Sequence, residues 1–142
     1  MFAGTFYWFP KMYGRMMNET LGKIHFYVTF VGVYAIFTPM HYLGIAGNPR
    51  RYSDFTNFDF LGKLLPVHSF MTQAAYGTAA IQILFFFNLF WSMKYGRKAP
   101  INPWNATTLE WTVPSPPPFD NFGGQHPVVN HGPYEYLSLI HI

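Results

Sequence analysis

The 142-residue sequence contains no cysteine and very few charged residues. Without cysteine, the chain cannot build disulfides, zinc–thiolate sites or iron–sulfur clusters from its own side chains. Charged residues make up 11% of the sequence, against about 25% in a typical soluble domain, whereas hydrophobic residues make up 50%. This composition indicates a membrane protein. The nine Lys and Arg residues form no run or stripe, so the sequence does not favour nucleic-acid binding.

Acidic residues are also scarce, and all six lie outside two long uncharged segments. These segments are residues 24–49, which are 26 residues long, and residues 64–93, which are 30 residues long. Since about 20 mainly apolar residues span a bilayer, each segment predicts a transmembrane helix. Neither predicted span contains a carboxylate, so this sequence offers none of the intramembrane acidic side chains that proton carriers use as relays.

The two ends of the sequence differ from these spans. Residues 1–10 are uncharged and aromatic but too short to cross a bilayer. We expect them to be the last turns of a span that begins upstream. The tail, residues 94–142, holds eight of the twelve prolines and is predicted to be irregular, with an apolar "LSLIHI" at its end. The sequence therefore predicts a fragment of a longer protein.

Basic residues are distributed unevenly around the two predicted spans. Six lie on one side and three on the other: Lys11, Arg15, Lys23, Lys94, Arg97 and Lys98 against Arg50, Arg51 and Lys63. Because Lys and Arg favour cytoplasmic loops, the segment before the first span and the tail are predicted to be cytoplasmic. The loop of residues 46–63 is then outside, which places its arginine pair against the usual bias.

Two histidines lie on the first predicted span. His25 and His41 are 16 residues apart, which places them on nearly opposite helix faces, so they cannot share one metal ion. No HExxH or other paired-ligand spacing occurs in the sequence. Each histidine is interpreted as a hydrogen-bonded interfacial or interhelical residue, with a direct proton or cofactor role as the alternative.

The stretch "IAGNPRRYSD", residues 45–54, contains the adjacent pair Arg50 and Arg51. One interpretation is a solvated interfacial loop in which Asp54 is a partial counterion. The other is a fork of planar donors for a carboxylate or phosphate, because guanidinium groups bind such anions in a bidentate manner. Pro49 restricts the backbone directly before the pair. The residue types alone leave both interpretations open.

Four stretches carry a resemblance to a known family. They are "MMNETLGKIHF", "FTPMHYLGIAGNPRRYSD", "NPWNATTLEWTVPSPPPFDNF" and "GPYEY". In this order and spacing they resemble the C-terminal part of subunit I of haem–copper terminal oxidases, of the bacterial aa3-type cytochrome c oxidase kind. The resemblance covers residues 1 to about 136, and the arginine and "TTLEW…SPPP" blocks are specific together.

The resemblance implies an all-α membrane fold, the C-terminal transmembrane helices of a twelve-helix bundle followed by an irregular Pro-rich tail. It implies six parts: the inner end of a truncated transmembrane helix (1–13), a cytoplasmic loop (14–22), a transmembrane helix (23–46), an outer loop with the Arg pair (47–65), a second transmembrane helix (66–94) and a cytoplasmic tail (95–142). This agrees with the orientation that the basic residues predict.

The resemblance also implies a site. In the family the arginine pair contacts haem propionates, so Arg50 and Arg51 are expected to bind them. The family's eleventh helix borders the low-spin haem, and Thr29, Val33 and Phe37 share one helix face, so they are candidates for a haem wall, with plain interhelical packing as an equal alternative. The ligands of the two haems and copper are expected upstream of Met1. This sequence is then expected to hold no catalytic residue and no metal ligand, and to be inactive alone.

The activity that the resemblance implies is electron transfer from cytochrome c to oxygen, which is reduced to water with proton pumping. Subunits II and III, cytochrome c and the lipid bilayer are the implied partners, and a multi-pass position in a bacterial inner membrane is the implied location. Two alternatives remain open. One is a quinol oxidase subunit I of the same superfamily, and the other is a small non-catalytic membrane subunit, which would have a natural start at Met1.

Overall fold

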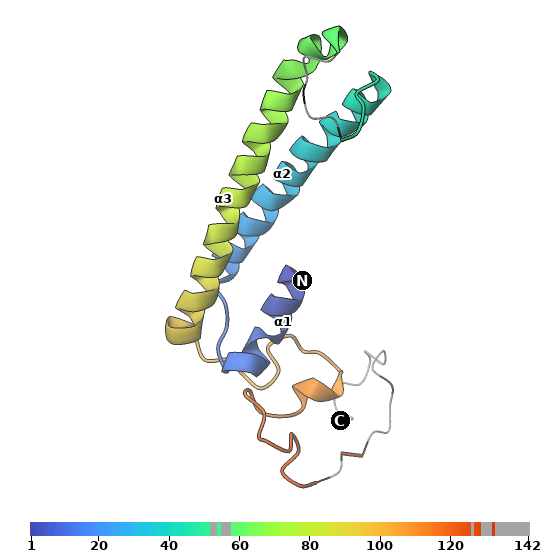
Figure 1. Ribbon diagram of the computed structural model, residues 1–142. Coiled ribbons are helices and arrows are strands. Elements are labelled where there is room, and N and C mark those ends of the chain that lie inside the picture. The colour runs from blue at the N-terminus through green and yellow to red at the C-terminus, as the bar shows by residue number, and fades with distance from the viewer. Residues whose placement is uncertain (52–53, 55–57, 126, 129–131, 133–142) are drawn as a thin grey trace. The chain divides into compact units, whose positions relative to one another are not determined.

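The computed structural model describes residues 1–51, 54, 58–125, 127–128 and 132. Residues of the predicted outer loop and tail beyond these, including the "LSLIHI" end, lie outside the described residues. Over the described ranges the regular structure is helical: α1 (Phe2–Tyr13), α2 (Glu19–Ile45), the 3-10 helix η2 (Asp59–Leu64), α3 (Leu65–Tyr95) and the 3-10 helix η3 (Leu109–Trp111) (Figure 1). No strand occurs in this part of the chain, so the prediction of an all-α fold is confirmed.

The chain divides into two compact units. The first comprises Met1–Asn18 and Asn88–Ile142, and the second comprises Glu19–Phe87. Helix α3 contributes its first part to the second unit and its last two turns to the first. Each unit brings together segments that are far apart in the sequence, and the contacts described below all lie within one unit.

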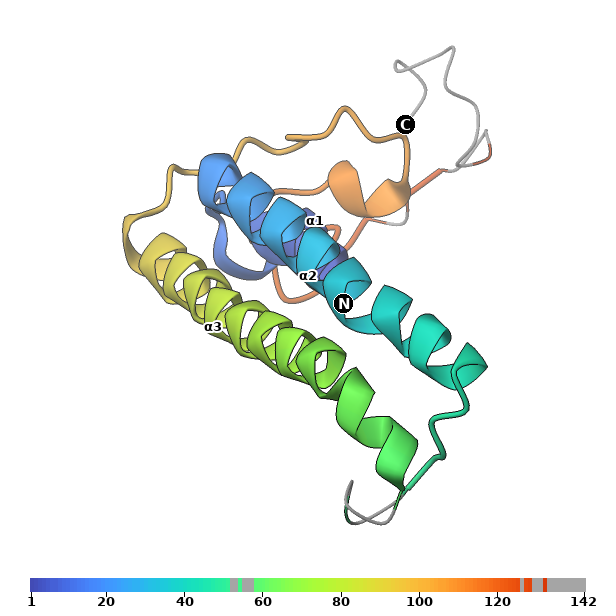
Figure 2. The same ribbon diagram turned by 90° about the horizontal axis from the view of Figure 1, so that it is seen from above.

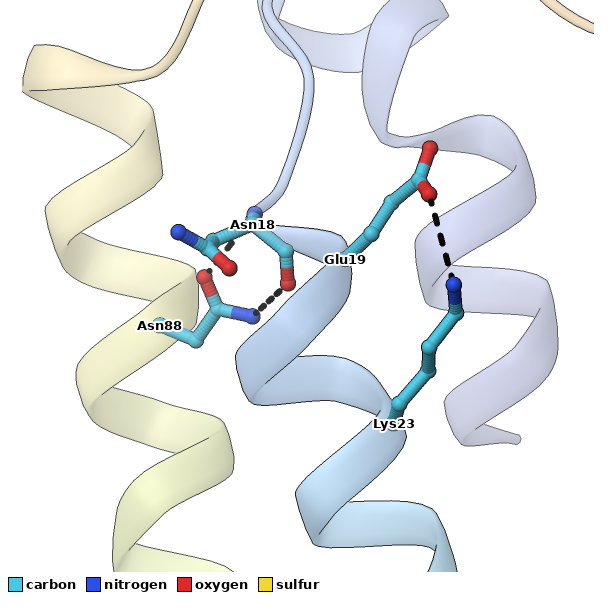
Figure 3. A network of polar contacts seen from close by, with 4 residues as sticks. All are labelled: Asn18, Glu19, Lys23 and Asn88. Atoms are coloured by element: carbon cyan, nitrogen blue, oxygen red, sulfur yellow. Dashed lines mark hydrogen bonds and ion pairs between the residues drawn. The ribbon is translucent and has the colours of Figure 1, made fainter.

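Helix α2 begins at Glu19, five residues before the uncharged segment starts at residue 24. The reason is visible in its first turn. Glu19 lies where the helix dipole favours a negative charge, and its carboxylate lies 4.0 Å from the Lys23 ammonium one turn later (Figure 3). The helix thus includes the charged residues Glu19 and Lys23, whereas the uncharged segment starts only after Lys23. The helix ends at Ile45, where Gly47 adopts a left-handed φ of 86° and the Asn48 N–H donates to the Leu43 carbonyl.

Two stretches of the chain are long and apolar enough to cross a membrane, by length and composition: α2 and the continuous stretch Asp59–Tyr95. Only 6% and 11% of their most apolar windows are buried inside the structure. The core helix of a soluble protein would bury most of such a window. These helices instead present their apolar side chains outward, as helices do that are surrounded by lipid or by further helices.

A polar cluster joins α2 to α3 within the second unit, where the two helices lie side by side (Figure 2). The buried His25 Nε2 lies 2.9 Å from Gln82 Oε1, and Gln82 Nε2 donates to the Thr29 hydroxyl at 3.3 Å. The expectation of an interhelical hydrogen bond for His25 is confirmed. Close by along the helices, a Cβ on Gly32 would meet the Thr78 side chain, so the glycine allows the two helices to approach.

In the first unit, the segment after α1 pairs with the segment after α3. Helix α1 ends at Gly14, whose φ is 65° and whose N–H donates to the Pro10 carbonyl. An isolated antiparallel bridge joins Arg15 to Lys98. Backbone hydrogen bonds from Met16 N to Arg97 O (2.8 Å) and from Ala99 N to Gly14 O (2.9 Å) flank this bridge. The two segments are therefore held in register by their backbones.

The same unit contains a reciprocal contact of two asparagines. The Asn18 N–H donates to Asn88 Oδ1 at 3.1 Å, and Asn88 Nδ2 donates to the Asn18 carbonyl at 3.0 Å (Figure 3). The Ser92 hydroxyl donates to the same Asn88 oxygen at 3.0 Å. Asn88 is buried, and all of its polar atoms have partners, so a polar residue inside a predicted span fastens the loop that precedes α2.

The tail folds back on α1. The Trp111 indole N–H donates to the Tyr7 hydroxyl at 2.7 Å, and the Trp104 indole N–H donates to the Tyr7 carbonyl at 3.0 Å. The Lys11 ammonium lies 4.9 Å from the Trp111 ring centroid and donates to the carbonyls of Val113 and Pro114. Trp111 is almost fully buried. The tail is irregular, as predicted, but it packs on α1 through specific contacts.

A candidate anion-binding arginine pair

Arg50 and Arg51 follow the turn that ends α2. Gly47 reverses the chain, Asn48 caps a carbonyl of the last helical turn, and Pro49 leads directly into the pair. Arg51 has a left-handed φ of 57°, a conformation that a non-glycine residue adopts rarely. The strained backbone means that the surrounding turn determines where this arginine lies, which is a common property of ligand-binding residues.

Both arginine side chains are exposed. In the part of the chain that the structure describes, the ion pair that forms is Glu19–Lys23, and neither guanidinium shares one with Asp54. Two adjacent guanidinium groups with available donors suit a carboxylate or phosphate from outside this chain, because each can bind such a group through two parallel hydrogen bonds.

Asn48 is a polar neighbour that the sequence interpretation missed. Its side-chain oxygen is buried and has no hydrogen-bond partner, two residues before Arg50. A buried acceptor without a donor is rare in folded proteins and points to a missing partner such as a bound water or ligand group. The signal in the sequence was a carboxamide next to Pro49 in an otherwise apolar turn. This oxygen needs a hydrogen-bond donor such as a bound water, whereas the neighbouring arginines suit an anion.

The predicted wall residues on α2 have different surroundings. The Thr29 hydroxyl accepts the hydrogen bond from Gln82 and is engaged with α3. Val33 and Phe37 are exposed, with 40% and 54% of their surfaces accessible, and are available to pack against a group outside this chain. The structure therefore divides the three: Thr29 contacts α3, whereas Val33 and Phe37 are exposed.

The two histidines of α2 do not meet. His25 bonds Gln82 across the helix pair, whereas His41 is exposed and its Nδ1 lies 2.8 Å from the Phe37 carbonyl of its own helix. Over the described residues, no three His, Cys, Asp or Glu side chains gather where they could hold a metal ion.

Fold and site together define a helical membrane protein that presents a pair of arginines at the end of an apolar helix. Residues 1–80 match the family described as "Cytochrome C and Quinol oxidase polypeptide I". This match covers more than half of the sequence, and the chain belongs to that family.

Relatives of this chain carry related descriptions. It is 46% identical over 136 residues to an "Alternative cytochrome c oxidase subunit 1" of Bradyrhizobium diazoefficiens, covering 94% of this chain and 23% of that protein. It is also 46% identical over 136 residues to a "Cytochrome c oxidase subunit 1" of Synechocystis (96% and 24%) and 39% identical over 145 residues to one of Corynebacterium glutamicum (99% and 24%). The chain spans about a quarter of the length of these curated relatives.

Proposed function

We propose that this chain is part of the catalytic subunit I of a respiratory terminal oxidase, which passes electrons from cytochrome c to oxygen, reduces it to water and pumps protons. The observation that carries the proposal is the arginine pair. Arg50 and Arg51 are adjacent, exposed and without an ion pair in the described chain, and they follow an apolar helix of an oxidase-family sequence. In this proposal haem and copper supply the electron transfer and oxygen chemistry.

The proposed role of the pair is to hold the propionate carboxylates of the haems. Each guanidinium donates two parallel hydrogen bonds to a carboxylate. The left-handed backbone at Arg51 sets the direction in which its side chain leaves the turn. The positive charges oppose the gain of a further positive charge by the iron, so they favour the reduced haem and raise its reduction potential. They also favour the ionised form of the propionates.

Haem fits the described residues in two further respects. The buried oxygen of Asn48 needs a donor close to the arginines, which a water bound between Asn48 and a propionate supplies. Val33 and Phe37 offer exposed apolar surface on α2, where the edge of a flat aromatic macrocycle can pack. In the proposed enzyme these residues exclude water from the haem and orient it, while the arginines fix its polar edge.

We place the whole enzyme in a bacterial inner membrane, with subunits II and III as partners and cytochrome c as donor. The bacterial origin of the relatives and their cytochrome c descriptions support these assignments. A quinol donor is the second candidate, because the family description includes quinol oxidases. A subunit II without copper-centre ligands in the purified complex would favour quinol.

The test replaces each arginine in the full-length subunit, as Arg50→Gln and Arg51→Gln. We expect each variant to lower a haem midpoint potential by roughly 30–100 mV, since about 59 mV corresponds to 1.4 kcal/mol for one electron and a charge lost near the haem changes the energy by about this amount. Optical redox titration measures the shift, and oxygen uptake measures the accompanying loss of turnover.

Lys63→Gln is the matched control. Lys63 is an exposed basic residue of the same predicted outer loop, and its replacement removes the same charge. We expect Lys63→Gln to leave the potentials within about 10 mV of the parent, because the exposed Lys63 charge is screened by water and salt and is not proposed to contact a propionate. Unchanged titrations and unchanged turnover in both arginine variants would refute the propionate role.

A further inference from the structure

The end of α3 carries a concentration of exposed basic and aromatic side chains. Lys94, Arg97 and Lys98 are all exposed, as are Trp91 and Tyr95 with 52% and 59% of their surfaces accessible. No acidic residue occurs between residues 88 and 109 of the sequence. This stretch is therefore a local cationic surface at the point where an apolar helix ends.

The backbone that carries these cations is held in a defined shape. The Arg15 guanidinium donates to the Gly96 carbonyl at 2.7 Å, and the Met16 N–H donates to the Arg97 carbonyl at 2.8 Å. The antiparallel bridge at Lys98 continues the pairing. Lys94 thus lies in the last turn of α3, and Arg97 and Lys98 lie in a backbone turn held by these bonds, so a ligand that binds them need not order a flexible segment first.

Basic residues of the same unit are used in two ways. Lys11 and Arg15 donate to backbone carbonyls of their own unit and hold it together. Within the described residues, the side chains of Lys94, Arg97 and Lys98 form neither a hydrogen bond nor an ion pair, and the Lys94 ammonium lies 5.4 Å from the Tyr95 ring centroid. Three charges are therefore available to an anion from outside the chain.

Two aromatic residues next to the cations, Trp91 and Tyr95, indicate which kind of anion fits this surface. The rings of Trp91 and Tyr95 lie 4.7 Å apart, one turn from each other, directly before the cations. Trp and Tyr with Lys and Arg beyond them is the arrangement found at the boundary of hydrocarbon and headgroups. A free phosphate would use the cations alone, whereas a phospholipid uses the cations for its phosphate and the rings for its glycerol and upper acyl chain.

We propose that Lys94, Arg97 and Lys98, with Trp91 and Tyr95, form a binding surface for the headgroup of an anionic phospholipid. The three cations neutralise the phosphodiester, and the two rings pack against the adjoining glycerol and acyl carbons. The surface anchors the C-terminal end of α3 at the membrane boundary and fixes the depth of the turn that pairs with residues 15–16. This inference requires the membrane location and not the oxidase activity.

The experiment uses the purified full-length protein complex and native mass spectrometry with added phosphatidylglycerol or phosphatidylcholine. The variant Lys94→Gln/Arg97→Gln/Lys98→Gln is expected to bind phosphatidylglycerol at least tenfold more weakly, since each basic residue near a membrane surface contributes roughly a fivefold factor. Its binding of phosphatidylcholine is expected to change by less than about twofold, because the zwitterionic headgroup carries no net charge.

Two further variants make the result decisive. The charge-preserving variant Lys94→Arg/Arg97→Lys/Lys98→Arg is expected to retain binding, which separates loss of charge from loss of fold. Lys23→Gln, which removes an exposed lysine already paired with Glu19, is expected to bind phosphatidylglycerol like the parent. Equal loss of both lipids, no loss in the triple Gln variant, or displacement of phosphatidylglycerol by millimolar inorganic phosphate would overturn the proposal.

Discussion

The two units of the chain are held together in different ways. In the unit of residues 1–18 and 88–142, residues 70 to 104 positions apart in the sequence meet through backbone hydrogen bonds, the reciprocal Asn18–Asn88 contact and the rings around Tyr7. In the unit of residues 19–87, two long helices meet at one polar cluster and otherwise direct apolar side chains outward.

This difference indicates where each unit finds its partners. In the described part of the first unit, many polar groups of the loops are paired within the unit, which an irregular Pro-rich segment needs wherever water is excluded. The second unit needs little polar pairing, because its helices satisfy their own backbones and their side chains suit lipid or further helices. Its apolar surface agrees with membership of an oxidase family whose relatives are about four times as long.

The largest expected effect is at Gly96, where the first unit is tightest. A Cβ at this position would meet two backbone oxygens, those of Ser92 and Met16, and neither can rotate away. Gly96→Ala should therefore lower the free energy of unfolding by about 3 kcal/mol, at the upper end for an overpacked site. Denaturation of the full-length protein in mixed detergent, followed by circular dichroism, measures the change.

Gly32→Ala is the matched change in the second unit. Its added Cβ would meet the Thr78 side chain, which can be trimmed, whereas a backbone oxygen cannot. We expect a loss of about 1 kcal/mol, partly offset by the better helix propensity of Ala, and recovery in Gly32→Ala/Thr78→Ala. If Gly96→Ala proved as mild as Gly32→Ala, the backbone pairing would not be what holds the first unit.

Sequence reasoning predicted the elements of this fold better than the contacts between them. The uncharged segments predicted α2 and the apolar part of α3, because a span is a local property of about 20 residues. Nothing in the sequence distinguishes Gln82 and Asn88 from the other members of the uncharged segment 64–93. Their partners lie 57 and 70 residues away, and no local pattern indicates which residues a polar side chain will meet across helices.

The tail and the arginine pair show the same limit from two sides. The prolines predicted irregular structure in the tail, yet the seating of Trp111 on Tyr7, 104 residues away, depends on how the chain folds back. At the arginine pair, the residue types alone left two interpretations open, a solvated loop and a binding site for a carboxylate or phosphate. Within the described residues the structure shows no ion pair between the arginines and Asp54, and it adds Asn48, which the sequence interpretation had not considered.

After Gly96→Ala, the largest expected loss of stability comes from breaking the polar link between α2 and α3 in the second unit. Gln82→Leu removes the carboxamide that joins His25 to Thr29, and His25 is buried. We expect a loss of about 1–2 kcal/mol in the free energy of unfolding, because a buried polar ring loses a hydrogen-bond partner. The same detergent denaturation measures it.

His25→Leu/Gln82→Leu tests whether the pairing itself matters. Replacement of both partners by apolar groups removes the unmatched His25 ring that Gln82→Leu leaves, so the double variant should be more stable than the sum of the single changes predicts. A coupling energy of about 1 kcal/mol is expected. Additive losses would mean that the two helices are held by packing alone, and the contrast between the units would then be sharper than the hydrogen bonds suggest.

The smallest expected effect is the hydrogen bond that seats the tail on α1. A double-mutant cycle of Tyr7→Phe and Trp111→Phe should give a coupling energy of about 1 kcal/mol, because each single change removes the same bond from the Trp111 indole N–H to the Tyr7 hydroxyl. Trp104 provides the matched control, since its indole donates to the Tyr7 backbone carbonyl, which Tyr7→Phe leaves in place. Tyr7→Phe with Trp104→Phe should be additive within about 0.3 kcal/mol. Equal coupling energies in both cycles would show that contacts between the rings, and not the hydrogen bond to the Tyr7 hydroxyl, hold the tail on α1.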